Sequence, residues 1–328
     1  MRILYAFHGD DWGAVQRAKI LIPLLREYFN VEVLQYGREE NLHFNEVVHF
    51  RIEKRKYNQF FRKFGAVLSI PTYEYAAVVT DNEPNSAWSA LIHATPCIQI
   101  KTPLTKLYRQ NSNILEKIWM RIKKEHYCPA NEQIDLCLSL DISSEKKILK
   151  ALSEEFCHLE KQNHYTVYLP EYDEKTISQV LFQFDVEWHV FTSLPYSYRI
   201  QNIWFRSFES KTFELSLKSA IGVMTDLNFQ ICLNTISNDS KLLVIPNKWQ
   251  KKEKRIIDNL KTFKIPILDS LDLVHFRSIR NWLEKKTEYH FEVISENSRV
   301  IEQINCFVLI HQPKISIAKY TWKLKFLW

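Results

Sequence analysis

Long apolar runs, glycines and paired cysteines are all scarce in this 328-residue sequence. No run of about 18 apolar residues occurs, so no segment is expected to span a bilayer. The six cysteines form no Cys-x-x-Cys pair, and no recognised zinc spacing occurs. The first seven residues lack the long apolar region and the cleavage site of a signal peptide. We therefore expect reduced thiols, a cytoplasmic location, and no metal or cofactor.

The net charge of +6 is modest, but positive charge is concentrated in two stretches that also contain aromatic residues. Residues 51–64 hold six Lys and Arg against one Glu, and residues 106–124 have the same balance. Such surfaces attract phosphates or anionic lipid head groups. The alternative is an ordinary solvated helix face. No recognised nucleic-acid-binding module occurs, so nucleic acid is not an expected partner.

Apolar runs of strand length alternate with helical patterns, an order typical of a parallel sheet covered by helices. In the first half we expect strands at residues 1–7, 30–37, 76–81 and 96–100 and helices at 14–29, 85–94 and 143–156. In the second half we expect strands at residues 164–170, 187–193, 219–225, 241–246 and 265–268 and helices at 174–184, 228–237 and 250–263. The sequence therefore predicts an α/β chain of two Rossmann-like domains that face each other across a ligand cleft.

Ligands of open α/β sheets bind beyond the carboxyl ends of strands, near helix N-termini. The stretch HGDDWGAVQR lies at such a point after the first strand. Gly9 and Gly13 allow the backbone to turn tightly and approach a ligand, although no Gly-x-Gly-x-x-Gly fingerprint is present. Asp10, Asp11 and His8 are candidates to take a proton from a hydroxyl. The alternative is that the two acids cap the following helix, a contribution of roughly 0.5–2 kcal/mol.

The stretch TDNEPNSAW follows another expected strand. The carboxylates of Asp81 and Glu83 at this point can orient sugar or ribose hydroxyls. The alternative is an Asx turn at Asp81 and Asn82, with Asn85 as the cap of the next helix.

Four stretches are informative because of their order along the chain: MRILYAFHGDDWGAVQRAKILIPLL, AAVVTDNEPNSAWSALIHATPCIQI, HYTVYLPEYDEKTISQVLFQFDVEWHVFTS and VMTDLNFQICLNTISNDSKLLVIPNKWQKKEKRIIDN. The first resembles a strand followed by a GEGLGHxxRS loop, and the second a strand–turn–helix with the motif ISDFEP. The third resembles the first strand, helix and strand of a second domain. The fourth aligns without gaps with THGGFSLISEALSLGKPLIVIPxxxQxEQxxNA. Together they resemble the GT-B nucleotide-sugar glycosyltransferases, in the branch related to the lipid-linked N-acetylglucosaminyltransferases of peptidoglycan synthesis.

This resemblance implies an acceptor-binding first domain, residues 1–160, and a nucleotide-sugar-binding second domain, residues 161–312. We expect residues 313–328 to form a basic helix that packs back on the first domain. Ala14 stands where the family has a histidine, so the expected base is Asp11, with Asp10 or His8 as alternatives. The residues that the resemblance places on the acceptor side are Gly9, Gly13, Arg17, Asp81 and Glu83.

The donor side falls at two further strand ends, residues 225–230 and 246–253. Leu227 brings a side chain into space that the family keeps open with glycine, where backbone N–H groups meet a diphosphate. The residues that match the family motif are Thr225, Phe229, Pro246 and Gln250. The residues that occupy motif positions with a different side chain are Asp226, Asn228, Asn234 and Glu253.

The resemblance implies a metal-independent, inverting hexosyltransferase. The enzyme would move a sugar from a UDP-sugar donor to a hydroxyl of a carbohydrate or lipid-linked acceptor, as in cell-envelope or polysaccharide biosynthesis. Two alternatives stay open. The substitutions at Ala14, Leu227 and Asn234 favour a catalytically inactive scaffold or partner subunit with the same fold, and sugar-nucleotide epimerisation is a further activity of this fold.

A lipid-linked acceptor would place the first domain at the inner membrane face as a peripheral protein. Cations in residues 51–64 would then each contribute about 1 kcal/mol near an anionic surface, and Phe60, Phe61 and Phe64 would enter the head-group region. The alternative is that these phenylalanines face the protein core.

Overall fold

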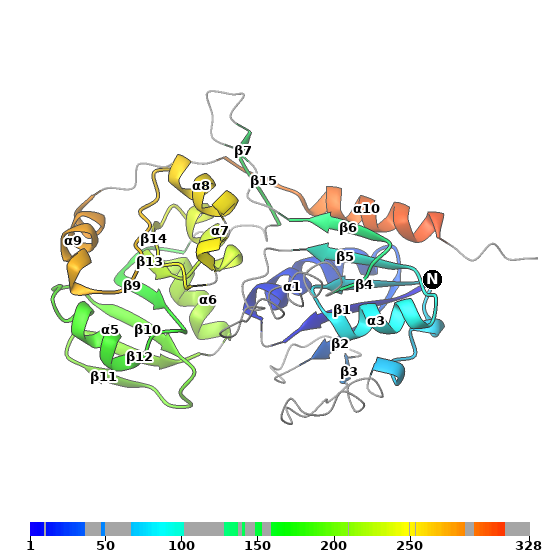
Figure 1. Ribbon diagram of the computed structural model, residues 1–328, viewed down its shortest axis with the longest axis horizontal. Coiled ribbons are helices and arrows are strands. Elements are labelled where there is room, and N and C mark those ends of the chain that lie inside the picture. The colour runs from blue at the N-terminus through cyan, green and yellow to red at the C-terminus, as the bar shows by residue number, and fades with distance from the viewer. Residues whose placement is uncertain are drawn as a thin grey trace, which may run out of the picture. The chain divides into compact units, whose positions relative to one another are not determined.

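The chain forms two compact units in a computed structural model (Figure 1). Within the described residues, the first unit contains residues 1–101, 128–135 and 298–311, and the second contains residues 136–297. The structure describes residues 1–9, 11–36, 47–49, 67–101, 128–136, 140–141, 148–152, 159–208, 210–248, 250–252, 254–285 and 292–311.

The first unit is built on a parallel sheet with the strand order β3-β2-β1-β4-β5-β6. Its strands are β1 (Arg2–His8), β2 (Asn30–Tyr36), β3 (Val47–His49), β4 (Ala77–Asp81), β5 (Cys97–Lys101) and β6 (Glu132–Asp135). The chain leaves β1 in one direction along the sheet and later continues from β4 in the other. The strand order therefore reverses between β1 and β4, the point where Rossmann-like sheets bind their ligands.

Helices cover both faces of this first sheet, because buried apolar residues follow each strand at helical spacing. Helix α1 (Trp12–Arg26) packs against β1 and β2, and α3 (Pro84–Ile92) packs against β4 and β5. Figure 1 shows α3 in front of the sheet and α1 behind it. The short helix η1 (Thr72–Glu74) contacts α3. Helix α10 (Asn297–Ile310) belongs to the first unit by its contacts, which differs from the expected boundary at residue 312.

The second unit repeats this plan with the strand order β11-β12-β10-β9-β13-β14. Neighbouring strands are parallel except for the edge strand β11. Here the order reverses between β9 and β13. The strands are β9 (Gln162–Tyr168), β10 (Trp188–Thr192), β11 (Tyr198–Ile200), β12 (Ile203–Ser207), β13 (Ala220–Thr225) and β14 (Lys241–Val244).

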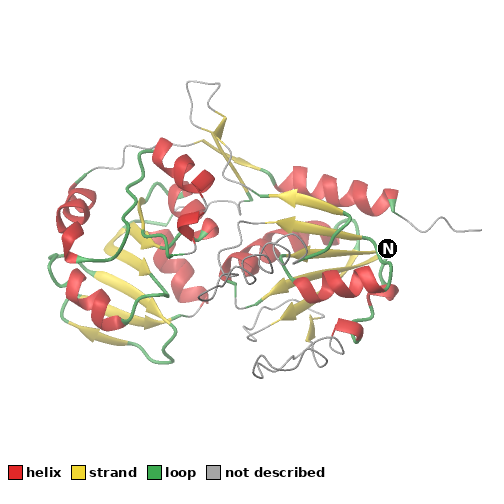
Figure 2. Cartoon of the chain, in the orientation of Figure 1, coloured by secondary structure: helices red, strands yellow, loops and turns green. Residues whose placement is uncertain are grey.

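Two helix layers enclose the second sheet. Helices α5 (Glu174–Leu181) and α9 (Phe276–Glu284) bury Val180 and Trp282 in a core with Trp188 and Phe205 from the sheet. Helix α6 (Ser210–Ser219) covers the other face, where Phe213 packs on Phe191. The remaining helices of this unit are α7 (Phe229–Ser237), η2 (Gln250–Lys252), α8 (Lys254–Thr262) and η3 (Leu273–His275). Figure 2 shows the alternation of helices and strands that this order produces.

The helix expected at residues 143–156 is wrong. Part of this segment forms strand β8 (Ile148–Ala151), which lies between β15 (Glu292–Ser295) and β7 (Leu140–Asp141) in a small third sheet. Pairing with a strand that lies far along the chain overrides the local helix propensity. The strand expected at residues 265–268 is reduced to a single bridge between Val244 and Ile267.

The other expected strands and helices are confirmed to within a few residues, and with them the α/β fold of two Rossmann-like sheets. The basic stretches 51–64 and 106–124 and the helix expected at 313–328 lie outside the described residues. Within the described part of the chain, no helix combines the length and the apolar character needed to cross a membrane.

Candidate functional site

Each sheet has its candidate residues at the carboxyl ends of the two strands where the strand order reverses. In the first unit these strands are β1 and β4, in register so that Phe7 lies beside Asp81. In the second unit they are β9 and β13, where Tyr168 lies beside Thr225. Parallel strands end at the same edge, so both positions open toward the helix N-termini that follow.

In the first unit the chain turns sharply between β1 and α1. The N–H of Gly9 donates to the carbonyl of Tyr36, and the N–H of Asp11 donates to the carbonyl of His8. Asp11 is the N-cap of α1, and its Oδ1 accepts from the N–H of Gly13 at 3.1 Å. The capping interpretation of Asp11 is therefore confirmed, whereas its role as a base stays a prediction. His8 and Asp11 are both half-buried, and Asp10 lies outside the described residues.

Arg17 and Asp81 form a buried ion pair behind this turn. The guanidinium donates to both carboxylate oxygens, from Nε to Oδ2 at 2.7 Å and from Nη2 to Oδ1 at 2.8 Å. The two residues are only 2% and 1% exposed. Burial raises the pKa of the Asp81 carboxyl, and the charge and hydrogen bonds of Arg17 oppose this rise. The pair joins α1 to the end of β4 and so fixes the geometry of the turn.

Glu83 is the N-cap of α3, a position that the sequence interpretation assigned to Asn85. Its Oε1 accepts from the N–H of Asn85 at 2.9 Å, and its Oε2 accepts from the N–H of Ser86 at 2.7 Å. The side chain is fully buried, and burial raises the pKa of the Glu83 carboxyl against these hydrogen bonds. The residues expected on the acceptor side thus lie together, with Arg17 and Asp81 bonded to each other and Glu83 bonded to the first N–H groups of α3.

In the second unit the turn after β13 and the start of α7 carry several residues that the resemblance places on the donor side. Thr225 is fully buried, and its Oγ1 has no hydrogen-bond partner within the described residues. Asn228 is the N-cap of α7, and its Oδ1 accepts from the N–H of Ile231 at 3.2 Å. Phe229 begins the helix and is buried. Asn234, one turn further on, is half-buried, and its Oδ1 accepts from Nε2 of Gln230 at 3.0 Å.

Gln250 joins this turn to the one that follows β14. Its Oε1 accepts from the N–H of Leu227 at 3.0 Å and from the N–H of Asn247 at 2.9 Å. Its Nε2 donates to Oδ2 of Asp226 at 2.9 Å. The structure thus brings Asp226 and Gln250 together. Glu253 lies outside the described residues.

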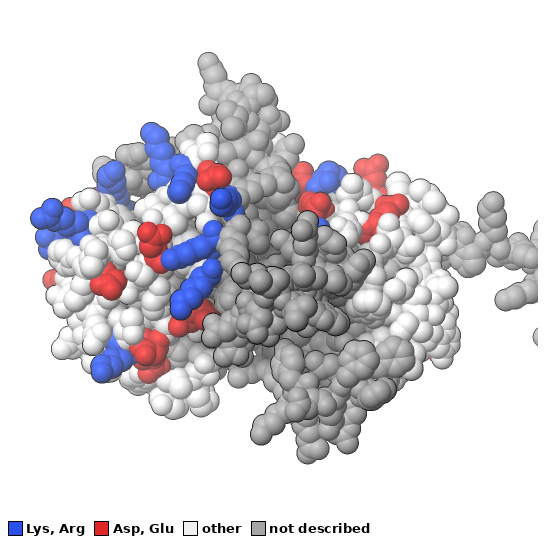
Figure 3. All heavy atoms as spheres, in the orientation of Figure 1, with Lys and Arg blue, Asp and Glu red and all other residues white. Residues whose placement is uncertain are grey.

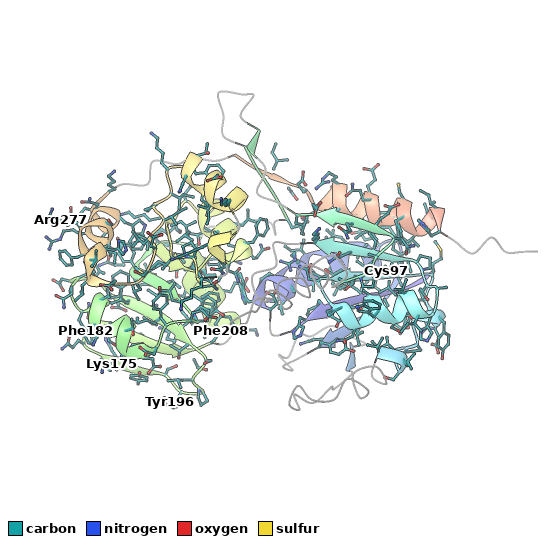
Figure 4. All side chains as sticks on the ribbon, in the orientation of Figure 1. Cys97, Lys175, Phe182, Tyr196, Phe208 and Arg277 are labelled. Atoms are coloured by element: carbon teal, nitrogen blue, oxygen red, sulfur yellow. The ribbon has the colours of Figure 1, made fainter. Side chains whose placement is uncertain are left out.

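An aromatic cluster at the same edge was missed by the sequence interpretation. The ring of Tyr168, at the end of β9, lies 5.1 Å from that of Phe208 and 5.3 Å from that of Phe213. Phe208 follows β12 directly and is half-buried, and Figure 4 labels it beside α6. The available signal was the apolar, aromatic-rich run IWF at residues 203–205, which is typical of a buried strand and shortly precedes Phe208.

Positive charge also lies at the turn after β14, which Gln250 joins to the turn after β13. Lys248, Lys251 and Lys254 are exposed next to Gln250, and Figure 3 shows Lys and Arg side chains on the viewed face of this unit around α8. Such cations favour an anionic ligand. The described residues contain no group of three or more His, Cys, Asp or Glu side chains placed to hold a metal ion.

No protein-family model and no curated protein matches this sequence. Solved structures match over nearly the whole chain at low identity. UGT2 of Phytolacca americana, in complex with UDP-2fluoro-glucose and pterostilbene, has a TM-score of 0.56 at 9% identity and covers 100% of this chain and 99% of its own. The glycosyltransferase SnogD of Streptomyces nogalater has a TM-score of 0.51 at 9% identity, with 99% of both chains covered.

A third similar structure is a putative UDP-N-acetylglucosamine 2-epimerase from Listeria monocytogenes. Its TM-score is 0.60 at 8% identity, with 93% of this chain and 94% of that chain covered. These proteins share with this chain the pair of parallel-strand Rossmann-like sheets described above. The chain therefore has the GT-B fold.

Proposed function

We propose that this protein is a glycosyltransferase that binds a nucleotide-activated sugar and transfers the sugar to a hydroxyl acceptor. The nucleotide sugar would bind at the switch point of the second unit, the place beyond the carboxyl ends of β9 and β13 where the strand order reverses. The observation that carries the proposal is the combination, at one sheet edge, of the α7 N-terminus with the aromatic pair Tyr168 and Phe208. A helix N-terminus suits phosphates, and an aromatic face suits a nucleobase, because each base has a π-face on which to stack.

The phosphates would meet the first N–H groups of α7. The first N–H groups of a helix have no partner inside it. In α7 the N–H of Ile231 donates to the side chain of Asn228. Those of Phe229 and Gln230 are the donors left for the ligand. Lys251, exposed at the adjoining turn, supplements them with charge. The nearby Asn234 would contact the ribose hydroxyls.

The acceptor would bind at the first unit's switch point. There the second carboxylate oxygen of Asp11 would take the proton of the attacking hydroxyl, while its Oδ1 caps α1. His8 and Asp10 are the alternative bases. Arg17 and Asp81 would act by holding the loop in place. A UDP donor, an inverting and metal-independent reaction, a carbohydrate or lipid-linked acceptor, and a cytoplasmic location with membrane contact through residues 51–64 belong to this proposal.

Epimerisation of a sugar nucleotide is a second candidate, supported by the likeness to the Listeria structure. A transferase needs an acceptor, whereas an epimerase converts the sugar nucleotide alone. Incubating the protein with UDP-N-acetylglucosamine and no acceptor, followed by chromatography of the sugar nucleotides, distinguishes the two activities.

An inactive scaffold is a third candidate, favoured by the turn after β13. Leu227 fills that turn with a buried side chain, and its N–H is already bonded to Gln250. Binding of any nucleotide sugar would count against this candidate.

Thermal unfolding with UDP, dTDP and their glucose derivatives tests the proposal. A ligand at 100 times its Kd stabilises the folded state by about 2.7 kcal/mol. We expect Phe208→Leu to reduce this shift, because it removes the stacking face, and Phe182→Leu to leave it unchanged. Phe182 is the matched control, a half-buried phenylalanine that packs on the other face of the same sheet. No shift with any nucleotide would refute the proposal.

A further inference from the structure

The side-chain amide of Gln250 is almost completely occupied by protein atoms. An amide oxygen has two lone pairs and its nitrogen two N–H groups. Both lone pairs of Oε1 are taken, by the N–H groups of Leu227 and Asn247, and one N–H of Nε2 is bonded to Asp226. The residue is 1% exposed. Little of this amide remains for a ligand.

The backbone of Gln250 strengthens the same connection. Its own N–H donates to Oδ1 of Asn247 at 3.0 Å, while the N–H of Asn247 donates back to Oε1 of Gln250. This reciprocal pair closes the turn after β14 around the side chain. The amide then reaches across to the turn after β13, 23 residues earlier in the chain at Leu227.

We propose that Gln250 is a positioning residue: it holds the β13–α7 turn against the β14–η2 turn and makes no contact with the ligand. This inference rests on the proposed nucleotide-sugar function for what the held turn binds. The connection itself rests on the hydrogen bonds alone.

The hydrogen bonds of Gln250 determine which polar groups the β13–α7 turn offers to a ligand. With its N–H bonded to Gln250, Leu227 has no donor for a phosphate. Asp226 is held by Nε2 of Gln250 through one carboxylate oxygen. A carboxylate accepts hydrogen bonds and repels phosphate. The turn after β13 therefore selects the hydroxyl-bearing part of the ligand, a ribose or hexose ring, and phosphates are left to the N-terminus of α7.

Two substitutions separate positioning from contact. Gln250→Leu removes all three side-chain bonds, so we expect at least tenfold faster hydrogen exchange at the amides of Leu227 and Asn247 and weaker binding of UDP-glucose. Gln250→Glu keeps the acceptor for both amides but sets a second carboxylate against Asp226. We therefore expect near-normal protection, at least tenfold weaker binding at pH 8, and recovery of binding as the pH falls and the new carboxyl becomes a donor.

Hydrogen exchange read by mass spectrometry and calorimetric titration with UDP-glucose measure these effects, with Gln183→Leu and Gln183→Glu as matched controls. Gln183 is an exposed glutamine of the same unit. If Gln250→Leu weakens binding while the two amides exchange as in the wild type, Gln250 contacts the ligand and the proposal is wrong. It is equally wrong if Gln250→Glu loses protection at every pH. A wild-type protein that binds none of UDP, dTDP and their glucose derivatives would refute the proposed function, and hydrogen exchange in the two variants would still decide whether Gln250 holds the two turns together.

Discussion

Replacing Asp81 by asparagine removes the negative charge that faces Arg17 inside the first unit. The guanidinium makes two short hydrogen bonds to this carboxylate, at 2.7 and 2.8 Å. Removing one partner of a buried ion pair destabilises a protein by about 3–5 kcal/mol, because the other charge stays buried without compensation. Asparagine keeps one oxygen acceptor, so we expect a loss near the lower end, about 3 kcal/mol.

Urea unfolding of the first unit measures this loss. The matched control is Glu74→Gln, which breaks an exposed pair in the same unit, Arg2 to Glu74 at 3.9 Å. Exposed pairs contribute about 0–1 kcal/mol, so the control should change little. The double variant Arg17→Met with Asp81→Leu should lose less than the sum of the single losses, because no charge is then left unpaired.

The result that would refute this reasoning is an Asp81→Asn variant within about 1 kcal/mol of the wild type. If that variant also lost transferase activity, Asp81 would act on the acceptor directly, as the family resemblance implies. A large loss of stability would instead assign Asp81 and Arg17 to the architecture of the loop.

Three further predictions follow from buried groups. The stability of the second unit should fall as the pH drops from about 6.5 toward 4. Burial, and then His189 stacked at 4.0 Å, lower the pKa of His164 in the folded state to about 4, whereas an unfolded histidine titrates near 6.5. Urea unfolding across this pH range measures the effect, and His164→Gln should flatten the curve. Glu83→Gln should weaken the cap of α3 by about 1 kcal/mol, measured by urea unfolding of the first unit. Gly222→Ala should destabilise the second unit by about 1–3 kcal/mol, seen as a lower Tm, because the added carbon would lie 2.9 Å from the ring of Tyr165.

Each of these predictions has an outcome that contradicts it. A flat stability profile between pH 4 and 6.5 would mean that the two histidines accept protons freely in the folded state. An unchanged first unit in Glu83→Gln would mean that a neutral amide caps α3 equally well. A wild-type Tm in Gly222→Ala would mean that Tyr165 moves aside without loss.

The sequence predicts those parts of the fold whose signal is local. The apolar runs at Arg2–His8 and Ala220–Thr225 are buried parallel strands, and such strands are recognised by composition alone. The helix predicted over residues 143–156 is wrong at Ile148–Ala151, a strand whose parallel partner, Glu292–Ser295, lies more than a hundred residues away. Strand pairing at that distance leaves no trace in the local pattern.

The candidate site divides in the same way. Strand ends and capping residues are recognisable from spacing, and the cap predicted at Asp11 is an example. The ion pair of Arg17 with Asp81 spans 64 residues, and a sequence shows that both side chains exist but not that they neutralise each other. For Gln250 the motif predicts a position at the turn after β14, and the hydrogen bonds of its side-chain amide show that it connects this turn to the turn after β13.

The contacts of α10 affect the order in which the two units can fold while the chain is being synthesised. This helix belongs to the first unit, although residues 136–297 of the second unit precede it along the chain. At about 5–20 residues per second, a ribosome needs on the order of 10–30 s to make that intervening stretch. During this time the nascent first unit lacks α10, whose Val300, Ile304 and Phe307 are buried in the finished protein. The described residues of the second unit, by contrast, all lie within 136–297, so these residues are complete before α10 is made and the core of the first unit can form.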